Sequence, residues 1–212
     1  MKHIIPPLLL TFVLYSCGNA ESQEKETSES QNETVGLSAE QLLDSANAMI
    51  GEFGLSPEAT SLVTRAIVQD PQNKRAYQKL ISIHTAQKNH EELKKALKEM
   101  NQKFPHDPYS KLHLAMETEL QSESDEFPLE MYSDSFDSFL TVMDTLASKA
   151  EIVRQGYILN AALSARLANM DKDQASDASK PHMASEELAI FENIFMELEN
   201  SEREELLNVR RN

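Results

Sequence analysis

Cysteine, tryptophan and glycine are scarce in this sequence of 212 residues, which contains one Cys, no Trp and five Gly. A single Cys excludes an intramolecular disulfide bond and a zinc site built from several thiolates. Glycine makes up about 7% of an average protein, and its scarcity here disfavours the turn-rich all-β folds. The length suffices for one domain with a substantial hydrophobic core.

Positive charge is scarce as well, since 20 Lys and Arg stand against 35 Asp and Glu and leave a net charge of −15. Proteins that bind nucleic acid rely on clustered Lys and Arg side chains, which neutralise the phosphates. We therefore expect no nucleic-acid partner.

The motifs of the common catalytic and metal sites are missing too. A zincin needs two His four residues apart on a helix, and no two histidines have that spacing. No Ser lies in a Gly-x-Ser-x-Gly turn, and no glycine-rich loop could surround a phosphate. His84 lies on the apolar side of a predicted helix, where a core histidine is more common than a ligand. We expect no enzymatic activity, no metal ion and no cofactor.

The N-terminal residues have the pattern of a secretory signal peptide. Lys2 supplies a positive start, and an apolar run from Ile4 to Leu14 follows it. A run of about eleven residues is too short to span a bilayer as a helix, which takes about 20, but it fits the core of a signal peptide. The sequence predicts a signal peptide at 1–16, and a short buried helix is the alternative.

The residues Leu14-Tyr15-Ser16-Cys17 resemble the lipobox of bacterial lipoproteins, with Tyr15 in place of the usual small residue. The resemblance implies cleavage before Cys17, which then carries diacylglycerol on its sulfur and an acyl chain, such as palmitate, on its amine. Several acyl chains together anchor a protein stably to a membrane. The resemblance also implies export, and Gly18 in place of Asp favours the outer membrane. An ordinary signal peptide with a chance Cys is the alternative.

Residues 17–37 are predicted to be the lipidated Cys and a flexible tether. The segment 18–37 contains five Glu, one Lys and few apolar side chains, so it cannot bury enough surface to offset the entropy of ordering. A flexible coil of this length spans about 25 Å on average. The tether would hold a folded domain off the membrane, on its periplasmic face or at the cell surface.

The remaining residues, 38–212, are predicted to form helical hairpins with a period. Pro71 and Pro105 each follow a helical stretch and lie 34 residues apart, which is the length of a tetratricopeptide repeat. The repeats would cover 40–73 and 74–107. Because no alternating β pattern of useful length is present, we expect an all-α fold.

Both segments resemble tetratricopeptide repeats (TPR) residue by residue. The matching residues are Gly54, Ala59, Ala66 and Pro71 in the first repeat and Tyr77, Leu80 and Pro105 in the second. Ile81, Leu93 and Met100 are larger than the residues that the family has there, so this would be a divergent member. The resemblance implies antiparallel helical hairpins stacked as a short TPR-like α-solenoid.

Capping residues predict where several helices begin. The predicted starts are Ser56-Pro57, the capping box Asn89 to Glu92, and Asp107-Pro108, and a turn is predicted at 51–54.

The segment 108–212 diverges from the repeat. An acidic insertion at 121–126 precedes a helix whose apolar stripe runs from Phe136 to Ala147. A fourth hairpin is predicted to pair 149–169 with 184–199. The first of these helices is apolar on nearly all sides, so we expect it to be buried.

Two further predictions concern the end of the chain. The polar residues 170–181 are expected to form a loop long enough to be mobile. Ser201 is expected to cap a short final helix that ends near Arg210 and closes the stack with a polar outer face.

The resemblance to TPR proteins implies a concave surface, lined by the first helix of each hairpin, that binds peptides or helices. In the second repeat the candidate partner-binding residues are Arg75, Gln78, Ser82 and Thr85, and in the first repeat they are Gln41, Asp44 and Ala48. The alternative is that these positions are merely solvated.

Charge is unevenly distributed along the helical part. Residues 74–107 contain eight Lys and Arg against four Asp and Glu, whereas 108–148 contain one against nine. The simpler interpretation pairs charges along helices, as in Glu91 with Lys95 and Glu99 with Lys103, or between adjacent repeats. The alternative is a basic strip beside an acidic one that steers an asymmetric partner.

Two functions are consistent with these patterns. The first is a membrane-tethered interaction or scaffold module of the cell envelope, which binds a protein or peptide through a helical-repeat groove. The alternative is an accessory or small-ligand-binding envelope lipoprotein with a pocket in helices 130–200.

Overall fold

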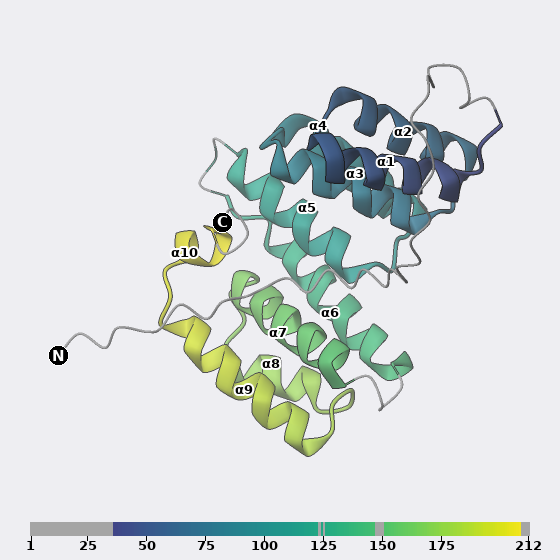
Figure 1. Ribbon diagram of the computed structural model, residues 1–212. Coiled ribbons are helices and arrows are strands. Elements are labelled where there is room, and N and C mark those ends of the chain that lie inside the picture. Colours follow the sequence, from purple (N-terminus) through teal and green to yellow (C-terminus); the bar gives the residue numbers. More distant parts are fainter. Residues whose placement is uncertain (1–35, 123, 125, 147–150, 209–212) are drawn as a thin grey trace. The chain divides into compact units, whose positions relative to one another are not determined.

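The computed structural model describes residues 36–122, 124, 126–146 and 151–208. Every regular element within these ranges is a helix (Figure 1), which confirms the expected all-α fold. The ten helices are α1 (Ala39–Phe53), α2 (Pro57–Gln69), α3 (Lys74–Ala86), α4 (His90–Lys103), α5 (Pro108–Leu120), α6 (Leu129–Thr145), α7 (Glu151–Leu167), α8 (Lys172–Ser179), α9 (Ser185–Glu199) and α10 (Arg203–Asn208). The predicted signal peptide, Cys17 and nearly all of the predicted tether lie outside the described residues.

Side-chain caps start the helices where the sequence predicts them. The Ser56 hydroxyl accepts a hydrogen bond from the Ala59 amide at 3.2 Å, and Pro57 opens α2. The Asp107 carboxylate likewise accepts from the Ser110 amide at 2.8 Å. Each cap satisfies one of the amides that the first turn of a helix leaves without a partner.

The capping box predicted at the start of α4 is half formed. The Asn89 side chain accepts from the Glu92 amide, but the Glu92 carboxylate binds Lys95 at 2.6 Å rather than the backbone of Asn89. The i+3 lysine draws the carboxylate away from the cap.

Each helix from α1 to α6 contacts the next one along the chain, and α7 packs on α9. The buried side chains form two clusters. The helices α1–α4 (39–103, the N-terminal half) enclose one cluster, and the helices α5–α10 (108–208, the C-terminal half) enclose the other. The second predicted repeat ends at Asp107, and the boundary between the two clusters lies at the same place, between α4 and α5.

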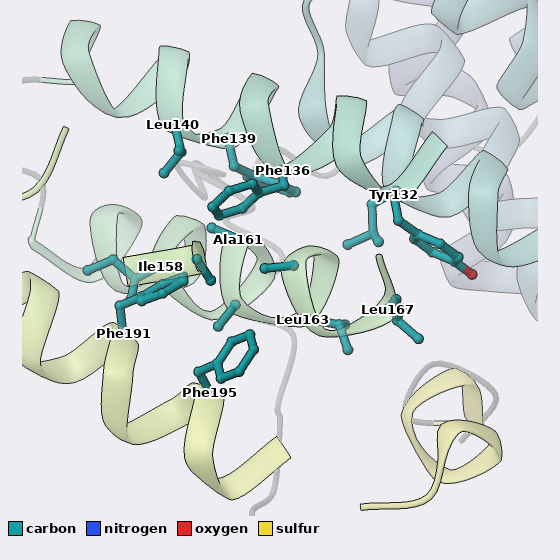
Figure 2. Close-up of a cluster of buried hydrophobic side chains, with 14 of the residues drawn as sticks. Tyr132, Phe136, Phe139, Leu140, Ile158, Ala161, Leu163, Leu167, Phe191 and Phe195 are labelled. Carbon is teal, nitrogen blue, oxygen red and sulfur yellow. The ribbon is translucent and has the colours of Figure 1, made fainter. Parts of the chain in front are cut away.

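The core of the C-terminal half is rich in aromatic rings. Figure 2 shows Phe136 and Phe139 of α6 pointing toward α7, while Phe191 and Phe195 of α9 approach α7 from its other side. All four side chains are fully buried. Helix α7 is thus the central helix of this half.

The prediction of a mobile loop at 170–181 is wrong for most of its length, because Lys172–Ser179 forms α8. Asp171 caps this helix by accepting from the Gln174 amide at 2.8 Å. Ala175 and Ser179 are fully buried. The segment is polar in composition, but Ala175 belongs to the core of the C-terminal half.

The turn predicted at 51–54 is also shorter than expected. Helix α1 continues through Gly51 to Phe53, and only Gly54 leaves the helical conformation, with φ +78°. A positive φ is readily adopted by glycine, so Gly54 rather than Gly51 ends the helix.

Helix α7 is buried only after its first turn. Ile152 and Val153 are 74% and 46% exposed, contrary to the prediction for 149–169. From Ile158 onward the side chains that face α6 and α9 are buried. An apolar composition alone does not reveal which turns a neighbouring helix covers.

The final helix, α10, begins at Arg203, and its predicted end near Arg210 lies beyond the described residues. Glu204 and Glu205 are exposed, which agrees with the expected polar outer face. Leu206 and Leu207, by contrast, are buried.

Candidate functional site

The four candidate residues of α3 lie in one exposed row. Arg75, Gln78, Ser82 and Thr85 follow the spacing i, i+3, i+7, i+10 that places side chains on one face of a helix, and none of the four is buried. The opposite face holds the buried residues Ala76, Tyr77, Leu80, Ile83 and His84. The structure therefore brings the predicted residues together. We call these four residues the α3 row.

The N-terminal end of the α3 row is tied to α1. Arg75 Nη1 lies 2.8 Å from Glu40 Oε2, and Asn73 Nδ2 donates to Glu40 Oε1 at 3.0 Å. Both charged side chains are more than half exposed, and such surface ion pairs contribute only about 0–1 kcal/mol. A partner's carboxylate could therefore replace Glu40 as the acceptor for Arg75.

The polar groups of the α3 row differ in their availability. The Thr85 hydroxyl donates to the Ile81 carbonyl at 2.8 Å. Among the described residues, neither the side-chain amide of Gln78 nor the hydroxyl of Ser82 has a hydrogen-bond partner. On α1, the predicted Gln41, Asp44 and Ala48 are likewise exposed. The central part of the row is thus free to bind a partner's backbone or side chains.

Equivalent contacts recur at the start of α3 and of α5. Asn73, which caps α3, binds Glu40. Asp107, which caps α5, lies 2.5 Å from Lys74. Each cap contacts a residue 33 positions earlier, in the first turn of the preceding odd-numbered helix. The period that the prolines suggested is therefore also present in the hydrogen bonds and ion pairs.

Adding 34 to the numbers of the α3 row gives the equivalent residues of α5. These residues, which we call the α5 row, are Tyr109, Leu112, Met116 and Glu119. None of them is exposed, and indeed no residue of α5 is. The sequence analysis did not single them out, although the 34-residue period would have located them. The exposed surface on α3 therefore ends at α5.

Side chains of later helices cover the two ends of the α5 row. Tyr109 makes edge-to-face contacts with the rings of Phe139 and Tyr157, each with centroids 5.1 Å apart. Glu119 accepts hydrogen bonds from Arg203 Nε at 2.6 Å and from the Tyr132 hydroxyl at 2.8 Å. Burial and the bond to Glu119 raise the pKa of Tyr132, so its hydroxyl remains a donor.

A second ion pair holds the C-terminal half together. Arg154 Nε and Nη2 bind the two oxygens of Glu187 at 2.5 and 2.9 Å, and Arg154 Nη1 donates to the carbonyls of Met143 and Leu146. The hydrogen bond from Arg154 lowers the pKa of Glu187. This pair joins α7 to α9 and also caps the end of α6.

The contacts of the basic segment 74–107 follow the expected pairing of charges only in part. Lys74 contacts Asp107, and His90 Nδ1 lies 3.1 Å from Glu117 Oε2. Along α4 itself Lys95 contacts Glu92 instead of the expected Glu91. Lys74 and Asp107 both belong to the segment 74–107, so of these two contacts only the one between His90 and Glu117 joins the two segments. An ion pair between the two predicted repeats is that of Arg75 with Glu40.

One hollow lies among α4, α5 and α6. It has a volume of about 350 Å³ and is lined by Asn101, Pro105, Lys111, Leu114, Met131 and Asp134. Its polar groups already bind one another or their neighbours, since Lys111 Nζ contacts Asp134 and Ser138, and Asn101 accepts from Ser110.

The described residues contain no group of three or more His, Cys, Asp or Glu that could hold a metal ion. Within the same ranges, no helix has the length and apolar character needed to cross a membrane. His84 is buried and its Nδ1 lacks a hydrogen-bond partner within the described part of the chain.

Comparison of the chain with protein families, with curated protein sequences and with solved structures finds no match.

Proposed function

We propose that this chain is a membrane-tethered lipoprotein whose helical domain, a short TPR-like α-solenoid, binds a protein or peptide of the cell envelope through the α3 row. Cys17 would carry the lipid anchor, most consistently at the outer membrane, and the domain would act by binding rather than by catalysis. The observation that carries the proposal is the α3 row itself, an exposed face of polar side chains with free hydrogen-bonding groups at its centre.

The recurring contacts of Asn73 and Asp107 support the solenoid. A helical hairpin cannot bury its apolar side alone, so stacked hairpins present their first helices side by side on one surface. Because Glu40 holds Arg75 beside α1, Gln41 and Asp44 would extend the surface from α3 onto α1. A bound segment would lie across both helices.

The chemistry of the α3 row favours a partner with hydrogen-bonding groups and a carboxylate. Gln78 and Ser82 can form hydrogen bonds with backbone amides and carbonyls, and Arg75 can form a bidentate pair with a carboxylate. The row contains no large apolar side chain, so affinity would come from polar contacts and from the tether, which raises the local concentration near membrane partners.

Proximity labelling in cells tests the binding surface. The variant Arg75→Glu/Gln78→Ala should lose a partner that the wild-type chain labels, by at least about tenfold, because its polar contacts are removed and one charge is inverted. Gln102→Ala, an exposed change on α4, is the matched control and should retain the labelling. Equal labelling by all three chains would contradict the proposal.

The anchor is tested separately. Cys17→Ala should remove metabolic labelling with a palmitate analogue and shift the chain from the detergent phase to the aqueous phase. Cys17→Ala that still partitions into detergent would show that the chain reaches the membrane by another route.

A further inference from the structure

Helix α10 is attached to the rest of the fold by a few side chains. It comprises only Arg203–Asn208, and the helix that it contacts most extensively is α7. Leu206 and Leu207 are 2% and 7% exposed and belong to the core of the C-terminal half. A helix of six residues is unstable by itself, so α10 is helical because it is docked.

Arg203 makes the polar part of this attachment. Its guanidinium binds both oxygens of Glu119, at 2.6 and 2.9 Å, and donates to the Leu167 carbonyl at 2.8 Å. The same group lies 4.2 Å from the centre of the Phe127 ring, within the range of a cation–π contact. Glu119 is only 8% exposed, and its carboxylate accepts hydrogen bonds from Arg203 and from the Tyr132 hydroxyl.

The three anchoring side chains of α10 share one face. Arg203, Leu206 and Leu207 are related as i, i+3 and i+4, which places them together on a helix. Glu204 and Glu205, between them in sequence, are exposed. The attachment is thus a pattern of one arginine and two leucines, presented by a single helical turn.

The place where Arg203 binds is one end of the α5 row. Glu119 is the residue equivalent to Thr85, 34 positions later. In the α3 row that position is open to solvent, whereas in the α5 row the chain's own C-terminal helix occupies it. A short helix, α10, therefore covers the end of the α5 row at Glu119.

We propose that the surface formed by Glu119, Tyr132 and the end of α7 is a docking site for a partner helix bearing Arg followed three and four residues later by Leu, and that α10 is an internal ligand which such a helix displaces. This inference rests on the proposed function, because it extends the proposed binding surface from α3 to α5. A helix of six residues that is held by few side chains opens more readily than the longer helices of the core do. A tethered segment competes at an effective concentration in the millimolar range, so the partner must bind more tightly than α10 does.

The site can be tested with a fluorescent peptide that has the sequence of Leu198 to Asn208, added to the full chain in detergent. The wild-type chain should bind it weakly, because α10 already fills the site. The variant Leu206→Ser/Leu207→Ser, which loosens α10 but leaves Glu119 and Tyr132 intact, should bind it at least about tenfold more tightly. Glu204→Ala, an exposed change in the same helix, should behave as the wild type.

A peptide in which Arg203 is replaced by Glu is the control ligand, and it should bind neither chain. Hydrogen exchange should show rapid exchange of the α10 amides in the Leu206→Ser/Leu207→Ser variant while α6 and α7 stay protected. Where that variant does not fold, Arg203→Ala carries the test, since it removes the contacts to Glu119 and keeps both leucines.

Equal affinity of the peptide for the wild type and the loosened variants would overturn the proposal. Equal affinity of the Arg-containing and Glu-containing peptides would overturn it as well. Neither result would bear on Arg75 and Gln78, because the peptide assay does not involve the α3 row. Failure of this inference and failure of the proposed function are therefore distinguishable.

Discussion

The N-terminal and C-terminal halves are both built from packed helices, but only the core of the C-terminal half contains fully buried phenylalanine rings. In the N-terminal half Ala46, Ala59, Ala66 and Ala76 are fully buried between helices. The C-terminal half buries five alanines as completely, and it adds four fully buried phenylalanine rings, Phe136, Phe139, Phe191 and Phe195. Small side chains therefore pack between helices in both halves, whereas fully buried phenylalanine rings occur only in the core of the C-terminal half within the described residues.

The two halves also differ in what they expose. The α3 row is polar and open, and the α5 row is covered by residues of α6, α7 and α10. The same face of a helix is therefore exposed or internal according to which other helices pack on it. The irregular C-terminal half limits the length of the open surface that the regular half presents.

The largest expected effect is the loss of an aromatic ring from the C-terminal half. Phe139→Ala removes a fully buried side chain that contacts the rings of Tyr109 and Tyr157. It should lower the free energy of unfolding by about 3–5 kcal/mol, the usual cost of such a cavity. Urea denaturation measures it, and a change below about 1 kcal/mol would show that the two halves do not differ in this way.

The next effect concerns the ion pair of the C-terminal half and depends on pH. Glu187→Gln leaves the largely buried Arg154 without its charged partner, which should cost about 2–3 kcal/mol at pH 7. Because the folded state holds the pKa of Glu187 below 4.5, its stabilisation is complete above that value and is lost as pH falls through the folded pKa. Wild type and variant should therefore converge as the pH falls below the folded pKa of Glu187, which urea denaturation at a series of pH values measures.

The exposed ion pair of the N-terminal half is the matched control. Glu40→Gln removes the partner of Arg75, but both side chains are more than half exposed, so the cost should stay under about 1 kcal/mol. Costs of similar size at Glu40 and Glu187 would remove the contrast between the halves.

Enlarging a buried side chain of the N-terminal half should destabilise the fold less than removing the Phe139 ring does. Ala66→Leu introduces three carbon atoms at a position with no exposed surface, and overpacking of this kind costs about 1–3 kcal/mol. Thermal unfolding would show a lower midpoint with helical content retained. An unchanged or higher midpoint would mean that the helices around Ala66 can accommodate a larger side chain.

Much of the helical fold was predictable from local sequence signals. The starts of α2 and α5 follow from Ser56-Pro57 and Asp107-Pro108, because these residues satisfy backbone amides within one turn. Helical periodicity placed the four residues of the α3 row on one outward face, which the structure shows to be exposed, whereas their binding role came from the resemblance to tetratricopeptide repeats. Signals of this kind need no knowledge of what packs against the helix, which is why they held.

Predictions that required such knowledge were less successful. Composition indicated a loop where α8 forms, since Ser176 and Ser179 look polar although they are buried. The exposure of Ile152 and the burial of the α5 row depend on which helices cover them. The role of Arg203 was not predicted because its partner Glu119 lies 84 residues earlier in the chain.

The sequence by itself determined that the described chain is helical and where several of its helices begin, and it indicated the period of 34 residues that the contacts of Asn73 and Asp107 repeat. These properties arise from capping, glycine scarcity and apolar spacing, all of which act over a few residues. Only the tertiary structure decided that α3 presents an open row while the equivalent row of α5 is covered. Burial depends on contacts between residues far apart in the chain, and local sequence patterns carry no record of those contacts.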